Sequence, residues 1–128
     1  MSFTCIKEKT TDDRRKKMAL MAVDALEDKK ANDISIIDIE KISTLADYFI
    51  IASGTNRNQV QAMCDEVDER LGKAGFEPKH IEGYNSANWI LLDYGDIVIH
   101  LFDEENRLFY DLERIWRDGI KIEKDSLK

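Results

Sequence analysis

The sequence predicts a single α/β domain in which helices pack against a mixed sheet. Its 128 residues suffice for one compact domain and are too few for two ordinary ones. Segments with the apolar period of a helix alternate with short β-branched runs typical of strands. The composition, 43 % hydrophobic and 35 % charged, is that of a globular protein. We expect the domain to span residues 11–118, between a frayed segment 1–10 and a tail 119–128.

The first predicted element is an amphipathic helix in the N-terminal quarter. Apolar residues recur there at helical spacing, at Met18, Met21, Ala22, Ala25 and Leu26. A basic run at 14–17 adjoins Asp12 and Asp13, so we interpret it as a solvated helix face rather than a DNA-binding patch.

Two strands are predicted next. Residues 33–39 alternate polar and β-branched apolar side chains, which is typical of a strand with two different faces. Residues 47–53 are almost continuously apolar and end at Gly54, a pattern that indicates a strand buried on both faces.

A second helix is predicted from about Asn56 to the stop signals Gly75 and Pro78, with Asn56 and Gln59 resembling a weak capping box. Its apolar stripe consists of Val60, Met63, Cys64, Val67 and Leu71. A short strand at 79–83 and a loop at 83–88 follow. A last helix begins at about Glu104, with an apolar stripe of Leu108, Leu112, Ile115 and Trp116.

Between that loop and the last helix, the sequence predicts a β-hairpin with the residues WILLDYGDIVIHLF (89–102). Gly95-Asp96 suits a two-residue type II′ turn, because Gly readily adopts the positive φ that this turn needs. The turn fixes a register in which Trp89 opposes Phe102, and opposed residues share a face. One face is then plain core: Ile90, Leu92, Tyr94, Ile97, Ile99 and Leu101. The other face carries Trp89, Leu91, Asp93, Val98, His100 and Phe102.

The second face of this hairpin admits two interpretations. An aspartate is costly to bury unless it is paired, whereas protein-binding surfaces commonly mix aromatic anchors with polar groups. Either a helix covers the face and Asp93 pairs with an arginine such as Arg107 or Arg114, or the face binds a partner.

Charge and cysteine usage narrow the classes of function. The formal net charge of −7 argues against a broad electrostatic grip on nucleic acid and is compatible with a basic protein partner. Cys5 and Cys64 lie far apart and form no metal-binding motif. The longest apolar run, 18–23, is too short to span a membrane, and no signal peptide is visible, so we expect a cytoplasmic protein without membrane contact.

The residues also predict no enzyme, no metal and no cofactor. Ser53-Gly54 between a strand and a helix suggests a phosphate-binding turn, but a nucleotidyltransferase would also need paired carboxylates on a following strand. Asp38-Ile39-Glu40 has the spacing but precedes the turn. His100 and Asp93 could form an acid–base pair, yet no nucleophile is placed beside them.

Three stretches, DYFIIASGTNRNQV (47–60), EGYNSANWILLDYGDIVIHLF (82–102) and RLFYDLERIW (107–116), closely resemble the Iojap/RsfS family of ribosomal silencing factors. The resemblance implies a nucleotidyltransferase-like α/β fold without the catalytic carboxylates. It also implies binding to the large ribosomal subunit through its fourteenth protein, a basic β-barrel. The bound factor would sterically block the small subunit and lower translation when nutrients are scarce.

Carried over by motif, the resemblance places the family's contacts on the hairpin. The contact tryptophan falls on Trp89, the acidic contact on Asp93, the hairpin-tip position on Tyr94 and the next-strand apolar contact on Phe102. The full set of expected partner-binding residues is Trp89, Asp93, Tyr94, Phe102, Leu91, His100 and Asp96. Two alternatives stay open: a nucleotide-binding enzyme of the nucleotidyltransferase type, and a homodimer that pairs through this face when the protein is free. Contact of the tails with ribosomal RNA is also left open.

Overall fold

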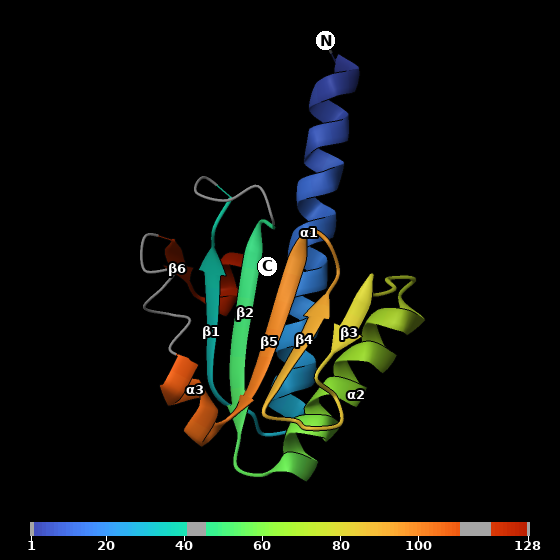
Figure 1. Cartoon of the computed structure of the whole chain (residues 1–128). Helices are drawn as coiled ribbons and strands as arrows, with labels where there is room; N and C mark the ends of the chain where they lie inside the picture. The colour runs from blue at the N-terminus through green and yellow to red at the C-terminus, as the bar shows by residue number, and fades with distance from the viewer. Residues whose placement is uncertain (1, 41–45, 111–118, 128) are drawn as a thin grey trace.

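A six-stranded sheet with the order β3-β4-β5-β2-β1-β6 forms the centre of the molecule in a computed structural model, which describes residues 2–40, 46–110 and 119–127 (Figure 1). The strands are β1 (Asn32–Asp38), β2 (Tyr48–Gly54), β3 (His80–Glu82), β4 (Trp89–Asp93), β5 (Ile97–Asp103) and β6 (Ile120–Ile122). The helices are α1 (Ser2–Asp28), α2 (Arg57–Lys73) and α3 (Glu104–Tyr110), followed by the 3-10 helix η1 (Lys124–Leu127). β2 and β5 run parallel, whereas β4 and β5 are antiparallel, so the predicted mixed sheet is confirmed.

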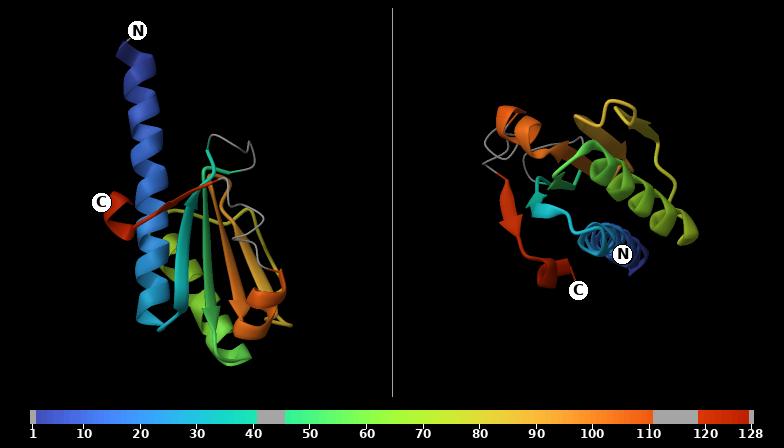
Figure 2. Two further views of the ribbon diagram at one scale, coloured as in Figure 1. Left: turned by 90° about the vertical axis from the view of Figure 1, so that its left-hand side faces the viewer. Right: turned by 90° about the horizontal axis from the view of Figure 1, so that it is seen from below.

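The helices divide the sheet into two faces. α1 and α2 cover one face, which we call the inner face, and α3 lies on the opposite side, which we call the outer face (Figure 2). Every residue of β2 is buried, as the continuous apolar run predicts. The largest buried cluster lies between the inner face and the two long helices, and it contains the predicted core residues Ile90, Leu92, Tyr94, Ile97, Ile99 and Leu101.

Helix α2 shows how closely local sequence determines local structure. Its buried residues are the predicted stripe of Val60, Met63, Cys64, Val67 and Leu71. Asn56 is the N-cap, and its side chain accepts a hydrogen bond from the Gln59 backbone N–H at 2.8 Å. The Gln59 side chain reaches back to the backbone N–H of Thr55, one residue before the position that a capping box would use.

The N-terminal segment differs from the expectation that residues 1–10 fray. α1 begins at Ser2, and its first turns extend beyond the sheet (Figure 1). The stripe at 18–26 packs on the core, and no Gly or Pro interrupts the chain before it. Because helix extension adds one hydrogen bond for each residue fixed, the packed half can propagate toward the N-terminus.

The C-terminal segment also differs from the expected tail. β6 pairs antiparallel with β1, with Ile122 opposite Ile36 and Ile120 opposite Asp38. This pairing satisfies the backbone groups along the outer edge of β1, which would otherwise be exposed. Leu127 of η1 is then buried in the inner core. The expected later turns of the last helix, with Leu112, Ile115 and Trp116, lie outside the described residues.

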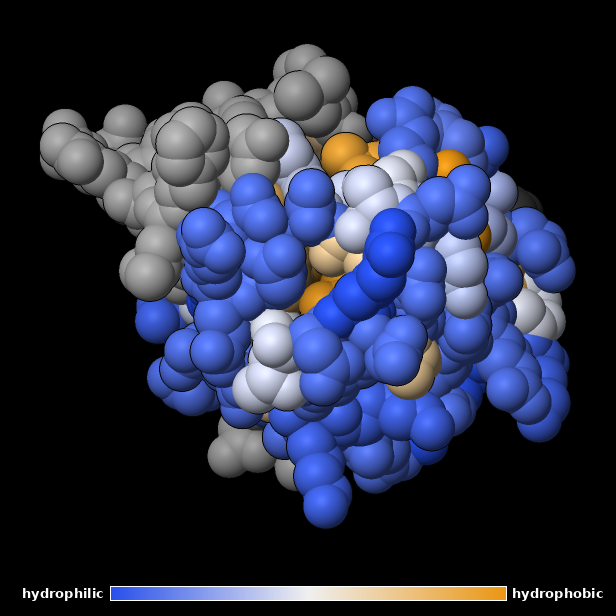
Figure 3. All heavy atoms as spheres, turned by 60° about the horizontal axis from the view of Figure 1, so that its bottom comes forward, coloured by the Kyte–Doolittle hydropathy of each residue, from blue (hydrophilic) through white to orange (hydrophobic). Residues whose placement is uncertain are grey.

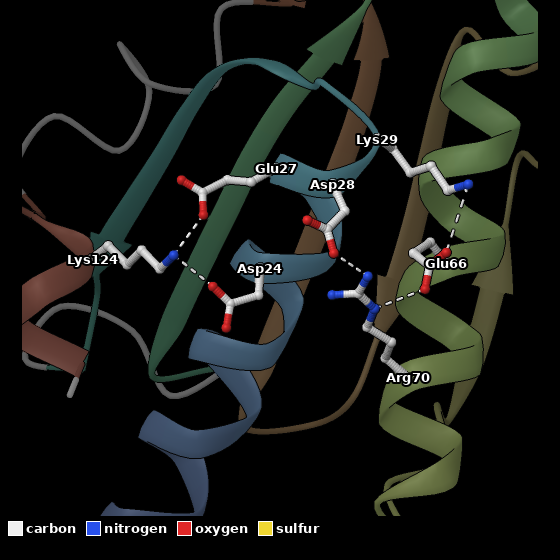
Figure 4. A network of polar contacts seen from close by, with 7 residues as sticks. All are labelled: Asp24, Glu27, Asp28, Lys29, Glu66, Arg70 and Lys124. Atoms are coloured by element: carbon white, nitrogen blue, oxygen red, sulfur yellow. Dashed lines mark hydrogen bonds and ion pairs between the residues drawn. The ribbon is translucent and has the colours of Figure 1, made fainter.

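Charged side chains join α1 to its two neighbours (Figure 4). The Lys124 ammonium of η1 lies 2.5 Å from the Asp24 carboxylate and 2.6 Å from that of Glu27. The Arg70 guanidinium of α2 contacts the carboxylates of Asp28 and Glu66. Within the described ranges, none of the helices combines the length and apolar character needed to cross a membrane.

Candidate functional site

The hairpin has the predicted register. Trp89 lies opposite Phe102 and Asp93 opposite Val98, and the Tyr94 N–H donates to the Ile97 carbonyl at 3.0 Å. Gly95 has a φ of 88°, as the first central position of a type II′ turn requires. The predicted division of the hairpin into two faces is therefore confirmed.

The outer face has a small core of its own. The pairing of β5 with β2 places Val98, His100 and Phe102 beside Phe49, Ile51 and Ser53. The buried residues of this cluster are Ile37, Ile39, Ala46, Phe49, Ile51, Val98 and Phe102. Trp89 and Leu91 of β4 pack against the cluster but keep part of their surface accessible. The accessible apolar groups of the hairpin's outer face thus belong to β4.

The Trp89 indole is held by contacts on two sides. Its ring stacks on Phe102, with centroids 5.3 Å apart and an interplanar angle of 29°. Its Nε1–H donates a hydrogen bond to Nδ1 of His100 at 3.0 Å. The Trp89 backbone also packs closely against Gly83, because a Cβ at Gly83 would lie 2.1 Å from the Trp89 carbonyl oxygen.

His100 lies beneath the surface rather than on it. Its side chain is only 5 % exposed, and its ring meets Phe49 edge-on with centroids 4.8 Å apart. Burial lowers the pKa of His100 to about 4, so the imidazole is neutral near pH 7. The structure places His100 on this face, as the sequence predicts. Its hydrogen-bond partner there is the Trp89 indole.

Asp93 has a neighbour that sequence reasoning missed. β3 pairs with β4 so that His80 lies opposite Asp93, with the His80 Nε2 atom 3.6 Å from the Asp93 carboxylate. The other oxygen of Asp93 accepts a hydrogen bond from the Gly95 N–H at 2.8 Å. Glu82, also on β3, has its carboxylate 3.8 Å from the same His80 nitrogen. The sequence signals for this cluster were His80 in the predicted strand 79–83 and Glu82 in the EG motif.

The arginine partners suggested for Asp93 do not form that contact among the described residues. Arg107 instead donates to the hydroxyl oxygens of Ser53, at 3.2 Å, and Ser35, at 3.3 Å. Arg114 lies outside the described residues.

Two of the expected contact residues lie off the outer face, as the predicted register and turn require. Tyr94 is only 7 % exposed and belongs to the inner core, where burial raises the pKa of its hydroxyl well above the usual value. Alternation along β4 dictates this placement, since Tyr94 follows Asp93. Asp96 occupies the turn, where its carbonyl accepts a hydrogen bond from the Asp47 N–H at 2.7 Å. Phe102 lies on the outer face but is only 1 % exposed, so it supports Trp89 from below.

The Ser53-Gly54 turn is filled by the chain's own groups. Ser53 is 1 % exposed, and its hydroxyl donates to the Asn32 carbonyl at 3.2 Å. The N–H groups of Thr55 and Gln59, which a phosphate could use, donate to the side chains of Gln59 and Asn56. Figure 3 views the molecule from this end, where most of the visible residues are hydrophilic and hydrophobic residues show only in small areas.

The described residues offer little for catalysis. They contain no group of three or more His, Cys, Asp or Glu side chains that could hold a metal ion. An Asp38 carboxylate oxygen accepts a hydrogen bond from the Glu40 N–H, a local turn contact. Burial raises the pKa of the Cys64 thiol to about 12, which keeps it protonated and unreactive.

Comparison with known proteins identifies the family. The family described as ribosomal silencing factor during starvation matches residues 11–128. Ribosomal silencing factor RsfS of Bacillus subtilis is 40 % identical over 105 residues, which cover 82 % of this chain and 89 % of that protein. Its counterpart from Halalkalibacterium halodurans is 38 % identical over 107 residues, or 84 % of this chain and 92 % of that protein. A crystal structure of a Chromobacterium violaceum protein, 36 % identical, matches with a TM-score of 0.78 over 84 % of this chain and 88 % of that one. The chain belongs to the RsfS family of ribosomal silencing factors.

Proposed function

We propose that this protein represses translation by binding the large ribosomal subunit and sterically preventing the small subunit from joining. Membership of the silencing-factor family supports a role at the ribosome. The main support for a docking surface here is Trp89. Its indole is partly accessible and is held by Phe102 and His100, and it lies on the sheet face that α1 and α2 leave uncovered. The proposal places the action in the cytoplasm during nutrient limitation.

The partner that we propose is the fourteenth protein of the large subunit, which is basic. The chain carries a formal charge of −7, and the carboxylates of Asp93 and Glu82 lie on the same side of the sheet as Trp89. Complementary charge would accelerate encounter with a basic protein and disfavour a nucleic-acid backbone. Trp89 and Leu91 would supply the apolar contact, with Asp93 accepting hydrogen bonds from a Lys or Arg at its rim.

A subunit-joining assay tests the function. Separated subunits are mixed with the protein, and sucrose gradients measure the fraction that forms intact ribosomes. The unmodified protein should keep the subunits apart, whereas Trp89→Ala should weaken binding by about 30-fold or more, the usual loss for a buried aromatic anchor. Ile120→Ala is the matched control, because Ile120 is 55 % exposed on β6, at the opposite edge of the sheet.

Folding must be unchanged for this comparison to count, so circular dichroism accompanies both variants. If Trp89→Ala co-sediments with large subunits as well as the unmodified protein does, the hairpin is not the docking surface. If the unmodified protein binds large subunits yet intact ribosomes still form, the steric block is wrong.

The same surface could pair two copies of the free protein, since Trp89 and Leu91 are apolar and partly accessible. Light scattering of the free protein tests this, with Trp89→Ala as the variant that should shift a dimer toward monomer. A monomeric unmodified protein would contradict pairing and leave the ribosomal proposal intact.

A further inference from the structure

His100 occupies a position where an aliphatic or phenyl side chain would be expected. It lies in the middle of β5, opposite Ile51 of β2 and Leu91 of β4, and is only 5 % exposed. Its Nε2 atom is buried and has no hydrogen-bond partner among the described residues. Burying an imidazole with one nitrogen unsatisfied is unfavourable for stability, so packing alone does not explain this residue.

The other ring nitrogen makes one specific contact. Trp89 Nε1–H donates to His100 Nδ1 at 3.0 Å, and an indole N–H can only donate. Nδ1 must therefore be the unprotonated acceptor, which assigns the proton of the neutral ring to Nε2. The orientation of the His100 ring is set by its edge-on contact with Phe49, with ring centroids 4.8 Å apart.

These contacts fix the indole in two different ways. Phe102 stacks on the indole face and defines its plane, but a stacked ring can still slide or turn over. The hydrogen bond to His100 defines which edge of the indole points into the sheet. The indole keeps part of its surface accessible.

We propose that His100 is a positioning residue for docking: it touches no partner itself and acts by holding the Trp89 indole in its binding orientation. This inference rests on the proposed function, because it assigns His100 a role in the same ribosome-binding surface. Pre-ordering an anchor lowers the entropy that binding would otherwise cost. Burial of the imidazole keeps it neutral, and so an acceptor, throughout the neutral pH range.

A double-mutant cycle with isolated bacterial large subunits tests the inference. His100→Phe puts a somewhat larger apolar ring in place of the imidazole and removes the acceptor, whereas His100→Asn keeps a carbonyl acceptor near the Nδ1 position. Trp89→Phe keeps an aromatic anchor but removes the donor. We expect His100→Phe to weaken binding about tenfold, which corresponds to one hydrogen bond, and His100→Asn to restore most of that loss. In the Trp89→Phe background, His100→Phe should change affinity less than about twofold.

Nuclear magnetic resonance of the free protein provides a readout independent of binding. The indole N–H signal that disappears in Trp89→Phe belongs to Trp89, and it should shift and exchange faster in His100→Phe but not in His100→Asn. The inference would be overturned if His100→Phe weakened binding equally in the unmodified protein and in the Trp89→Phe variant. It would also be overturned if His100→Phe left the affinity of the protein with Trp89 unchanged. An unshifted indole signal would also overturn it.

The outcomes separate this inference from the docking proposal. If Trp89→Ala weakens binding while His100→Phe does not, the surface is right and the positioning role is wrong. If Trp89→Ala has no effect, the surface is wrong and the positioning role fails with it. Should His100→Phe fail to fold, His100→Leu, which also lacks an acceptor, takes its place in the cycle. Ring-nitrogen shifts that show an Nδ1–H tautomer in the unmodified protein would also overturn the inference.

Discussion

Gly83 lies against the backbone of Trp89, the residue at which β4 begins. Gly83 has a φ of 80°, in the left-handed region, and a Cβ there would lie 2.1 Å from the Trp89 carbonyl oxygen. Both the conformation and the close approach therefore require glycine. Sequence reasoning could place a loop at 83–88 but could not foresee this contact, which joins residues on either side of that loop.

Replacing Gly83 by alanine should destabilise the protein strongly. We expect Gly83→Ala to lower the free energy of unfolding by about 2–4 kcal/mol, since backbone strain and a backbone clash add together. Gly75→Ala is the control, because Gly75 also has a positive φ, 90°, but nothing lies within 4 Å of its added Cβ. That variant should cost only about 1 kcal/mol. Urea unfolding measures the stability of both variants. Equal losses of stability in Gly83→Ala and Gly75→Ala would show that the backbone clash at Gly83 is relieved without cost.

His100 should make stability depend on pH. Its pKa is about 4 in the folded protein, below the ordinary value of 6.5, because burial disfavours the charged ring. Between these values the unfolded chain binds a proton that the folded protein does not, so stability is complete above pH 6.5 and falls as the pH drops toward 4. The loss should approach about 3 kcal/mol.

Urea unfolding at several pH values between 7.5 and 4.5, compared between the unmodified protein and His100→Phe, measures this term. The carboxylates that titrate in the same range are common to both proteins and cancel in the difference. A parallel fall in both proteins would mean that His100 does not titrate abnormally.

At the level of elements, prediction succeeded where the pattern is local. The stripe of α2, the fully buried β2 and the register of the hairpin all follow from side-chain spacing and one turn signal within a few residues. It did not extend to the two ends of the chain, where the structure has α1 from Ser2 and β6 beside β1. The start of α1 depends on propagation from a packed half, and β6 depends on an edge that only the assembled sheet provides.

The C-terminal segment should therefore contribute to stability. Leu127 is only 4 % exposed in the inner core, so Leu127→Ala should lower the free energy of unfolding by about 2 kcal/mol. Lys121→Ala, an exposed position on β6, should change it by less than about 0.5 kcal/mol. Thermal unfolding measures both variants. Equal stability of Leu127→Ala and Lys121→Ala would mean that η1 does not pack as described.

At the level of the whole molecule, the order of strands was beyond sequence reasoning. β5 inserts beside β2 in parallel, although nearly fifty residues separate their starts, and this pairing creates the outer-face cluster of Phe49, Val98 and Phe102. Alternation placed Trp89, Leu91 and Asp93 on the outer face, where the structure has them. It could not show that His100 and Phe102 are buried under the neighbouring strands, nor that His80 of β3 faces Asp93.

The acidic charge of the molecule should make docking depend on salt. Binding to large subunits should weaken as potassium chloride rises, because screening shortens the reach of attraction between the acidic protein and a basic partner. Asp93→Asn should weaken binding and flatten this salt dependence. Glu69→Gln removes the same charge from an exposed position on α2, away from the outer face, and should do neither. Indistinguishable effects of the two variants would mean that overall charge, not Asp93, governs the interaction.

The tight turn at Gly95-Asp96 makes β4 sensitive to insertions. The turn fixes the register, and neighbouring residues point to opposite sides of the sheet, so one codon inserted within β4 would turn every preceding side chain of that strand inside out. Trp89 would then point toward the long helices and Ile90 toward the outer face. An insertion in β4 would therefore disrupt the inner core and the outer face together.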